Sequence, residues 1–382
     1  MNRGAGYNAA MNRILATYHI TADSSAIEAR AAALAAEQSV EMPPAAITDP
    51  YVRDEILARV ERIEPLSPGS FAVTLGIAEA TTGPEPGQLM NMLFGNCSLQ
   101  DDLRLVDVEF PATTLEAFSG PRFGLAGIRK LLGAANRALT MTALKPQGLD
   151  AEALGQLCGT FARAGIDIIK DDHGIANQRY SPFAARVRAC QRQLHAANAA
   201  TGRHSVYAPS ISGSPRQIAE HLRIAREEGV SMFLTCPLLL GVPTFHELAQ
   251  ETAGVPLIAH PALGGASRIA PPLLLGRLFR LFGADATIFP NYGGRFSYSP
   301  DTCLALADAA RKPWGQLPAI APVPAGGMSV ARVPEMLQVY GQDTILLIGG
   351  ALLTAGAALY ERSCEFVNAV ANAATGGRSG HE

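Results

Sequence analysis

The sequence predicts an α/β protein with a C-terminal (β/α)8 TIM barrel and an N-terminal α+β domain of the ferredoxin-like type. Two observations carry this prediction. From about Arg137 onward, eight strand-like runs alternate with helical stretches over about 235 residues, the number and length expected of such a barrel. Before that point, strand-like runs mix with one alanine-rich helix, which is the pattern of an α+β fold. A doubly wound open sheet is the alternative for the second region, but eight even units are many for it.

The bulk composition fits this architecture and narrows the partners. A chain of 382 residues, 48% of them hydrophobic, is long enough for one large barrel and a smaller domain. The net charge of −3 and the lack of a basic block argue against nucleic acid and anionic membrane as partners. The six cysteines form no CxxC pair and fit buried thiols in a reducing cytosol. Without an apolar signal core or a long apolar run, we expect a cytoplasmic location.

The N-terminal part is expected to begin with a disordered lead-in at residues 1–11, followed by the α+β domain at 12–133. Its strand-like runs are residues 13–20, 71–78 and 104–111. Residues 24–39 form the alanine-rich helix, with Ser24 or Ser25 as a plausible N-cap.

The barrel domain is expected at residues 134–382. Its eight strand-like runs are residues 138–146, 166–172, 204–210, 231–237, 256–261, 286–291, 319–327 and 344–350. Helical stretches such as 150–165, 214–229 and 329–341 lie between them.

Polar residues and glycines gather where these strands end. Catalytic groups of a barrel sit at the C-terminal ends of its strands, so these residues predict the active-site rim. In chain order they are Lys145, then Lys170, Asp171, Asp172 and His173, then His260, Asn291, the pair Gly326 and Gly327, and the pair Gly349 and Gly350.

Each group at the rim also has a plain structural interpretation. The glycine pairs after strands 7 and 8 suit a phosphate held by backbone N–H groups, or are simply two tight turns. Asp172 and His173 beside Lys170 suggest a divalent cation site, or a salt-bridged strand end. Lys145 can hold or protonate an enolate oxygen, or make one more ion pair. His260 is either a core histidine or a catalytic group.

Several motifs resemble those of the large chain of ribulose-bisphosphate carboxylase (RuBisCO). "GIDIIKDDHGIANQ" is similar to the "GxDxxKDDE" strand of that family, and "TALKPQGL" to its strand-1 lysine motif. "PVPAGGMSV" and "LLIGGALL" resemble its two glycine phosphate motifs, in the same order. "ARAAALAAEQS" and "NMLFGN" look like the N-terminal segments that reach a neighbouring subunit's active site. The resemblance spans about Arg13 to Asn372 and identifies the chain as a RuBisCO superfamily member.

The resemblance implies a role for each matched residue. Lys170 would be carbamylated by CO2, and its carbamate, Asp172 and His173 would bind Mg²⁺ or another divalent cation. Asp171 is not a ligand in the family. Lys145 would lie near the enolising centre, and His260 would be the strand-5 active-site histidine. Glu37 and Asn96 would be supplied to the site by a partner subunit, which implies a homodimer or a multiple of it.

The departures from the carboxylase pattern are informative. The second strand-1 lysine is Gln147, and the N-terminal Thr–Trp pair appears as Met42 and Pro43. The residues that hold one of two substrate phosphates, or its neighbouring hydroxyls, are replaced by Pro261, Gly264, Ile288 and Ala325. Losing such a cationic clamp weakens phosphate binding, while the glycines for the other phosphate remain. We therefore expect a substrate with one phosphate, and a RuBisCO-like protein that does not fix CO2 productively.

Three functions follow from the resemblance. The preferred one is metal-dependent enolisation of a monophosphorylated keto sugar or sugar acid, with decarboxylation of a 3-oxo sugar-acid phosphate of the 3-oxo-isoapionate 4-phosphate type. That preference rests partly on His173, where a glutamate is expected in sulfur-salvage relatives. The alternative is an isomerase or enolase of 5-methylthioribulose-1-phosphate or a related sulfur-salvage substrate. A non-catalytic phosphate-binding protein is the third, and retention of Lys145, Lys170 and Asp172 argues against it.

Overall fold

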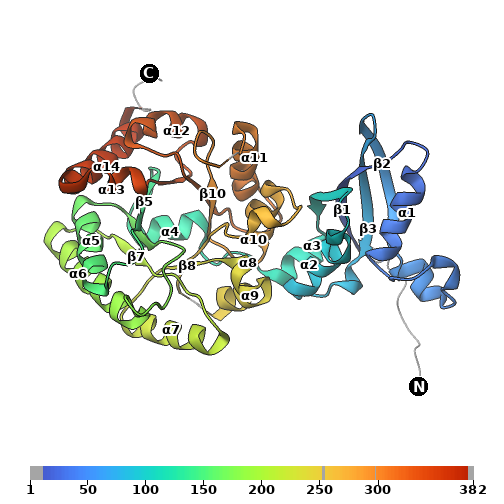
Figure 1. Cartoon of the computed structure of the whole chain (residues 1–382), viewed down its shortest axis with the longest axis horizontal. Helices are drawn as coiled ribbons and strands as arrows, with labels where there is room; N and C mark the ends of the chain where they lie inside the picture. Colours follow the sequence, from blue (N-terminus) through green and yellow to red (C-terminus); the bar gives the residue numbers. More distant parts are fainter. Residues whose placement is uncertain (1–11, 252–253, 297, 377–382) are drawn as a thin grey trace. The chain divides into compact units, whose positions relative to one another are not determined.

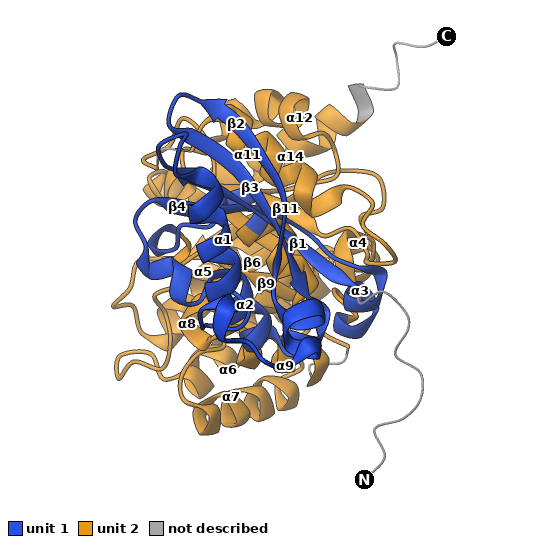
Figure 2. Cartoon of the chain, turned by 90° about the vertical axis from the view of Figure 1, so that its right-hand side faces the viewer, with its two compact units in different colours: residues 1–118, 265–273 blue, residues 119–264, 274–382 orange. Residues whose placement is uncertain are grey.

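The computed structural model describes residues 12–251, 254–296 and 298–376 (Figure 1). It divides into two compact units, coloured in Figure 2: unit 1 comprises Met1–Phe118 and Gly265–Leu273, and unit 2 comprises Ser119–Gly264 and Leu274–Glu382. The expected lead-in at residues 1–11 lies outside the described residues. The domain boundary expected between residues 133 and 134 stays a prediction.

Unit 1 is built on a four-stranded antiparallel sheet in the order β2-β3-β1-β4. Its strands are β1 (Arg13–Thr21), β2 (Arg59–Ser67), β3 (Ser70–Ala78) and β4 (Leu103–Glu109). Side chains alternate along β1 between buried and half-buried, as expected of a strand with one face on the core. The sequence does not reveal β2, because this edge strand is charged and exposed along almost its whole length.

The helices of unit 1 include the predicted alanine-rich helix, but the predicted cap is wrong. They are α1 (Ile27–Glu37), α2 (Pro86–Phe94) and α3 (Ala112–Phe118), with short 3-10 turns at Pro44–Ala46, Glu79–Thr81 and Asn96–Leu99 and a π-helical turn at Val52–Ile56. No side chain caps α1. Ser24 and Ser25 lie in a preceding turn, closed by the Ala26 N–H donating to the Asp23 carbonyl at 2.9 Å.

Unit 2 contains the eight predicted parallel strands, in the order β7-β6-β5-β12-β11-β10-β9-β8. They are β5 (Leu139–Leu144), β6 (Ile168–Asp171), β7 (Val206–Ala208), β8 (Phe233–Thr235), β9 (Leu257–Ala259), β10 (Ala286–Pro290), β11 (Ala321–Ala325) and β12 (Ile345–Leu347). The two ends of this sheet meet where the Leu234 N–H donates to the Pro209 carbonyl and the Ile211 N–H to the Leu234 carbonyl. The predicted barrel is confirmed.

Helices surround these strands, as Figure 1 shows. They are α4 (Gly124–Leu132), α5 (Ala151–Ala164), α6 (Phe183–Thr201), α7 (Pro215–Glu227), α8 (Pro237–Leu240), α9 (Val242–Glu251), α10 (Phe279–Leu281), α11 (Pro300–Arg311), α12 (Val333–Tyr340), α13 (Gly350–Leu353) and α14 (Leu359–Gly376). Short turns of 3-10 helix occur at Gly264–Ala266, Val330–Arg332 and Gly356–Ala358, and a π-helical stretch at Pro272–Leu278.

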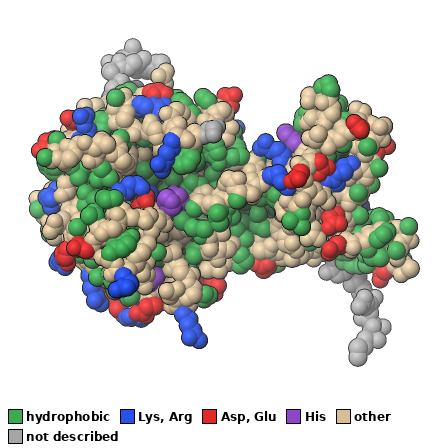
Figure 3. Space-filling model, viewed as in Figure 1, with side chains coloured by type: hydrophobic (Ala, Val, Ile, Leu, Met, Phe, Trp, Pro, Cys, Tyr) green, Lys and Arg blue, Asp and Glu red, His purple; other side chains and the backbone are tan. Residues whose placement is uncertain are grey.

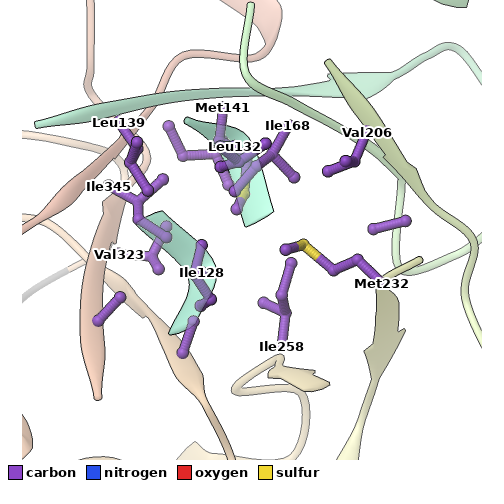
Figure 4. Packing of buried hydrophobic residues seen from close by; sticks show 14 of the residues in the cluster. Ile128, Leu132, Leu139, Met141, Ile168, Val206, Met232, Ile258, Val323 and Ile345 are labelled. Atoms are coloured by element: carbon purple, nitrogen blue, oxygen red, sulfur yellow. The ribbon is translucent and has the colours of Figure 1, made fainter. Parts of the chain in front are cut away.

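The barrel interior is a packed apolar core that α4 helps to close at one end (Figure 4). Inward-facing residues of the strands pack together with Leu125, Ile128 and Leu132 of α4. The N–H groups at the start of α4 donate to the carboxylate of Asp285, which directly precedes β10. The helix therefore lies at the N-terminal end of the strands, and their C-terminal ends are left for chemistry.

The mixture of charges on the surface and the polarity of the helices agree with the composition of the sequence. On the face shown in Figure 3, acidic and basic side chains are interspersed over both units. Within the described residues, no helix is both long and apolar enough to cross a membrane.

Candidate active site

The end of β6 delivers its ionisable side chains to two different environments. Lys170 and Asp171 are the last residues of the strand and Asp172 follows it, and all three are buried. The side chain of His173, one residue later, remains 45% exposed. Because successive side chains of a strand point to opposite sides, the two aspartates meet different partners.

Asp171 ties the strand to its surroundings. One carboxylate oxygen accepts a hydrogen bond from the Tyr207 hydroxyl at 2.7 Å. The other accepts from the Ser210 N–H at 3.0 Å and from Nε of the fully buried Arg186 at 3.1 Å. Asp171 is therefore neutralised by α6 and held by the end of β7. The sequence does not single out Arg186 or Tyr207: α6 carries three arginines, and only the tertiary structure shows that Arg186 is the buried one.

Asp172 joins a second cluster, at the ends of β5, β6 and β9. Its Oδ1 lies 2.5 Å from Nζ of Lys145 and 3.6 Å from Nδ1 of His173. The His173 ring stacks on His260, with centroids 4.3 Å apart and planes 12° from parallel. The structure thus brings together the predicted residues Lys145, Asp172, His173 and His260.

Lys170 is buried and unusually easy to deprotonate. Burial lowers its pKa to about 8, with Lys145 acting in the same sense and Asp172 and Asp171 opposing the shift. Its Nζ donates to the Asp171 carbonyl at 3.0 Å. The carboxylate of Asp172 is instead paired with Lys145, and that of Asp171 with Arg186. The strand end is therefore salt-bridged, but by these two cations and not by Lys170.

Electrostatics fix the charge states of the neighbouring groups. Burial alone would raise the pKa of Asp172, but the hydrogen bonds to His173 and Lys145 hold it well below its ordinary value. Burial, then Lys170 and His173, lowers the pKa of His260 to about 2. His260 is therefore neutral and Asp172 ionised at neutral pH.

The tautomer of His260 follows from its backbone contact. The Ala262 N–H donates to Nδ1 of His260 at 3.2 Å, so Nδ1 carries the lone pair. In a neutral imidazole the proton is then on Nε2. His260 is consequently arranged to donate a hydrogen bond from Nε2 rather than to accept one.

Asp172 and His173 supply an oxygen and a nitrogen that suit a divalent cation, but two ligands do not make a closed site. No group of three His, Cys, Asp or Glu side chains gathers for a metal in residues 12–251, 254–296 and 298–376. The buried amine of Lys170 is the remaining candidate, and an amine becomes an oxygen ligand only after modification. The residues present therefore fit a cation on the condition that Lys170 carries an anionic group.

The four predicted phosphate glycines form two neighbouring turns. β11 and β12 are paired, so the turns that follow them are adjacent. Gly326 and Gly327 have φ of 81° and 64°, which favours glycine. A Cβ on Gly327 would lie 2.5 Å from Cα of Gly294, so packing against that turn also requires glycine here.

The second turn is open and borders the lysine cluster. A Cβ on Gly350 would meet nothing within 4 Å, and one on Gly349 would reach only Cε of Lys145, at 3.9 Å. Ile288, one of the positions where the carboxylase phosphate clamp is replaced, is part of the buried apolar core.

Glu37 and Asn96 lie in unit 1, whereas the cluster around Lys145 lies in unit 2. The Asn96 amide donates to Glu37 at 3.1 Å and to Glu41 at 3.0 Å. These side chains line a cavity of about 140 Å³ together with Gln38, Ser39, Asn91 and Met92. The sequence does not single out Glu41, whose φ of 51° is unusual for a residue with a side chain.

The fold and motifs match known proteins. The family model of the ribulose bisphosphate carboxylase large chain, catalytic domain, matches residues 124–287. Ribulose bisphosphate carboxylase-like protein 1 of Rhodopseudomonas palustris is 53% identical over 360 residues, covering 94% of this chain and 98% of the relative. The 5-methylthioribulose-1-phosphate isomerase of Rhodospirillum rubrum is 52% identical over 367 residues, covering 96% and 98%.

A solved structure has the same fold as this chain. The crystal structure of a Rubisco-like protein from Rhodopseudomonas palustris superposes with a TM-score of 0.89 at 52% identity, covering 97% of this chain and 99% of that one. With such identity over nearly the whole chain and the same fold, the chain belongs to the RuBisCO-like proteins of the ribulose bisphosphate carboxylase large-chain family.

Proposed function

We propose that this protein isomerises a ketose monophosphate of the 5-methylthioribulose-1-phosphate class through an enediolate. The cluster of Lys145, Asp172, His173 and His260 beside Gly349 is the observation that carries the proposal. The substrate class is supported by the isomerase of Rhodospirillum rubrum, at 52% identity over 96% of this chain. This similarity favours the sulfur-salvage alternative over the decarboxylation preferred from sequence, for which the comparisons give no support.

The charge distribution suits the developing enediolate. Removing a proton next to the substrate carbonyl places negative charge on its oxygen, and fixed donors aimed at that charge lower the barrier. The ammonium of Lys145 and the Nε2–H of His260 are two such donors, and burial keeps His260 neutral. Isomerisation is complete when a proton that has exchanged with solvent is delivered to the other carbon of the enediolate.

Lys170, in this proposal, is carbamylated by CO2, and its carbamate, Asp172 and His173 hold Mg²⁺ or another divalent cation. The lowered pKa of Lys170 supports this, because only the neutral amine reacts with CO2. When bound, the cation would act as a Lewis acid on the substrate oxygens. Imidazole is a weaker ligand for Mg²⁺ than carboxylate, so His173 also favours ions such as Mn²⁺.

One phosphate would be bound by the glycine turns at Gly326, Gly327, Gly349 and Gly350. Backbone N–H groups of such turns bind phosphate in many barrels, after strands 7 and 8. The buried apolar Ile288 supports a substrate without a second phosphate. Glu37 and Asn96 of a second copy would complete each site, so we propose a homodimer or a multiple of it.

Substrate comparison tests the proposed function. With Mg²⁺ and CO2, the protein should isomerise 5-methylthioribulose-1-phosphate and incorporate deuterium from D2O into the sugar carbon chain. It should neither decarboxylate a 3-oxo sugar-acid phosphate nor carboxylate ribulose-1,5-bisphosphate at a comparable rate. If decarboxylation is the faster reaction, the protein is the 3-oxo sugar-acid phosphate decarboxylase preferred from the sequence. If the protein binds the sugar phosphate without deuterium exchange, it is a non-catalytic phosphate binder.

A further inference from the structure

Arg332 contacts two backbone turns that come from different strand ends. It lies in the 3-10 turn Val330–Arg332, directly before α12. Its Nη1 donates to the carbonyl of Gly327 at 2.8 Å and to the carbonyl of Tyr292 at 3.3 Å. One guanidinium therefore bonds both the turn after β11 and the turn after β10.

The rest of the guanidinium is held in place by α12 and by Tyr292. Nε and Nη2 donate to the two carboxylate oxygens of Glu335, at 2.9 and 3.0 Å. The Tyr292 hydroxyl donates to the same carboxylate at 2.8 Å, and its ring lies 5.2 Å from Cζ of Arg332. The pKa of Glu335 is lowered to about 2, by Arg332 first and then by Tyr292, so the carboxylate stays ionised.

These bonds occupy all three guanidinium nitrogens of Arg332, and the attached carboxylate offsets its charge. Arg332 is thus poorly suited to bind an anion directly. Its effect is on the backbone instead. Each peptide group is planar, and these two are trans, so a carbonyl turned toward Arg332 turns the following N–H away from it. Arg332 thereby sets the directions of the N–H groups of Gly293 and Met328.

The two turns also touch directly. A Cβ on Gly294 would lie 2.9 Å from N of Gly327, and a Cβ on Gly327 would be 2.5 Å from Cα of Gly294. Backbone packs on backbone here, so neither turn can shift without moving the other. The two hydrogen bonds from Arg332 to these turns hold the contact in place from the side of α12.

We propose that Arg332 is a positioning residue that joins the turn at 292–294 to the turn at Gly326 and Gly327 and so shapes the phosphate site. This inference rests on the proposed function, because the phosphate site is part of it. Arg332 acts through the backbone, so its loss weakens the binding of the phosphate group and leaves the enolising cluster around Lys145 unchanged.

The test uses the full chain, inorganic phosphate as the probe, and a matched control. Arg362→Met removes an arginine with a similar surface pair to the glutamate three residues later, on α14. Arg332→Met should weaken phosphate binding by about tenfold, because the hydrogen bonds that hold the two turns in their binding arrangement are lost. It should raise KM by a similar factor, with kcat almost unchanged. Arg332→Lys should fall between Arg332→Met and the wild type, and Arg362→Met should match the wild type.

Gly350→Glu separates this inference from the proposed function. It adds a negative charge in open space, so it should fold and abolish phosphate binding if the glycine turns are the site. If the wild type binds no phosphate, or Gly350→Glu binds it normally, the proposed phosphate site falls and the inference with it. If Gly350→Glu loses phosphate while Arg332→Met, folded by its melting curve, binds like Arg362→Met, only the role of Arg332 is overturned.

Discussion

The role proposed for Lys145 depends on its two neighbours, Asp172 and Gly349. Its Nζ lies 2.5 Å from the carboxylate of Asp172, and its stem borders Gly349. It therefore stands between the proposed cation ligand and the proposed phosphate turn. A positive charge at this point is well placed to stabilise an enediolate oxygen.

Replacing Lys145 by methionine should lower kcat by roughly 10²- to 10³-fold, the usual cost of losing one oxyanion donor. The side-chain volume is almost kept and Asp172 keeps its contact with His173, so the fold should persist, although the loss of the ion pair lowers stability. Deuterium exchange into the substrate gives the rate of the proton-removal step. Lys312→Met, which removes an exposed lysine paired with Asp308, is the control and should be as active as the wild type. Equal rates for both variants would remove Lys145 from the chemistry.

Lys170 makes stability depend on pH in a defined window. Its pKa is about 8 in the folded chain against an ordinary value near 10.4, so between these values the unfolded chain binds more protons. Stability from this group therefore rises with pH from about 8 to 10.4, and the cost below pH 8 is about 3 kcal/mol.

Lys170→Met should remove this dependence. In CO2-free buffer without metal, the variant should be more stable than the wild type at pH 7, and the difference should shrink as pH rises toward 10. Urea unfolding at several pH values measures it. A difference that stays constant over this range would mean that Lys170 keeps an ordinary pKa.

At the scale of elements, the pair Asp171–Arg186 connects β6 to α6. Both side chains are fully buried, and Tyr207 and Ser210 add two bonds from the end of β7. The pair fixes the strand end that delivers Lys170 and Asp172. A buried charge that loses its partner is costly, whereas removing both charges together is often nearly neutral.

Arg186→Met should therefore destabilise the protein by roughly 3–5 kcal/mol, because Asp171 is left charged and unpaired. The double change Asp171→Asn with Arg186→Met should recover most of this loss. Arg188→Met, on the same helix, breaks only an exposed pair with Glu228 and should cost at most about 1 kcal/mol. Urea midpoints compare the three variants. A double variant no more stable than Arg186→Met would show that the ion pair is not the cause.

At the scale of the whole molecule, the proposed site needs residues from two copies of the chain. Glu37 and Asn96 are bonded to each other in unit 1, and the lysine cluster is in unit 2. If a second copy supplies Glu37, then two chains defective in different units can together form an intact site.

Mixing Lys170→Ala with Glu37→Ala chains after reversible dissociation should restore activity. In a random mixture half of the dimers are mixed, each with one intact site of two, so about a quarter of wild-type activity is expected. Each variant alone should be inactive. Sedimentation of the wild type as a fully active monomer would contradict the proposal, as would a mixture that stays inactive although mixed dimers form.

The sequence by itself determined the barrel, its strand order along the chain and the residues at its rim. Strand and helix periodicity are local properties, and parallel strands followed by helices bring their C-terminal ends to one edge. That is why Lys145, Asp172, His173 and His260 could be predicted to lie on the same rim. The exposed β2 gave no such signal, and the start of α1 was misplaced because a turn at Asp23–Ala26 competes with serine capping.

Only the tertiary structure decided which neighbour each of these groups meets. Asp171 and Asp172 are chemically identical in sequence, yet Arg186 neutralises one and Lys145 the other. The proton position on His260 depends on the Ala262 N–H, and the environment of Gly327 on Gly294 and Arg332. Charge state and hydrogen-bond direction depend on burial and on partners far apart in the chain, and these are fixed only when the barrel closes.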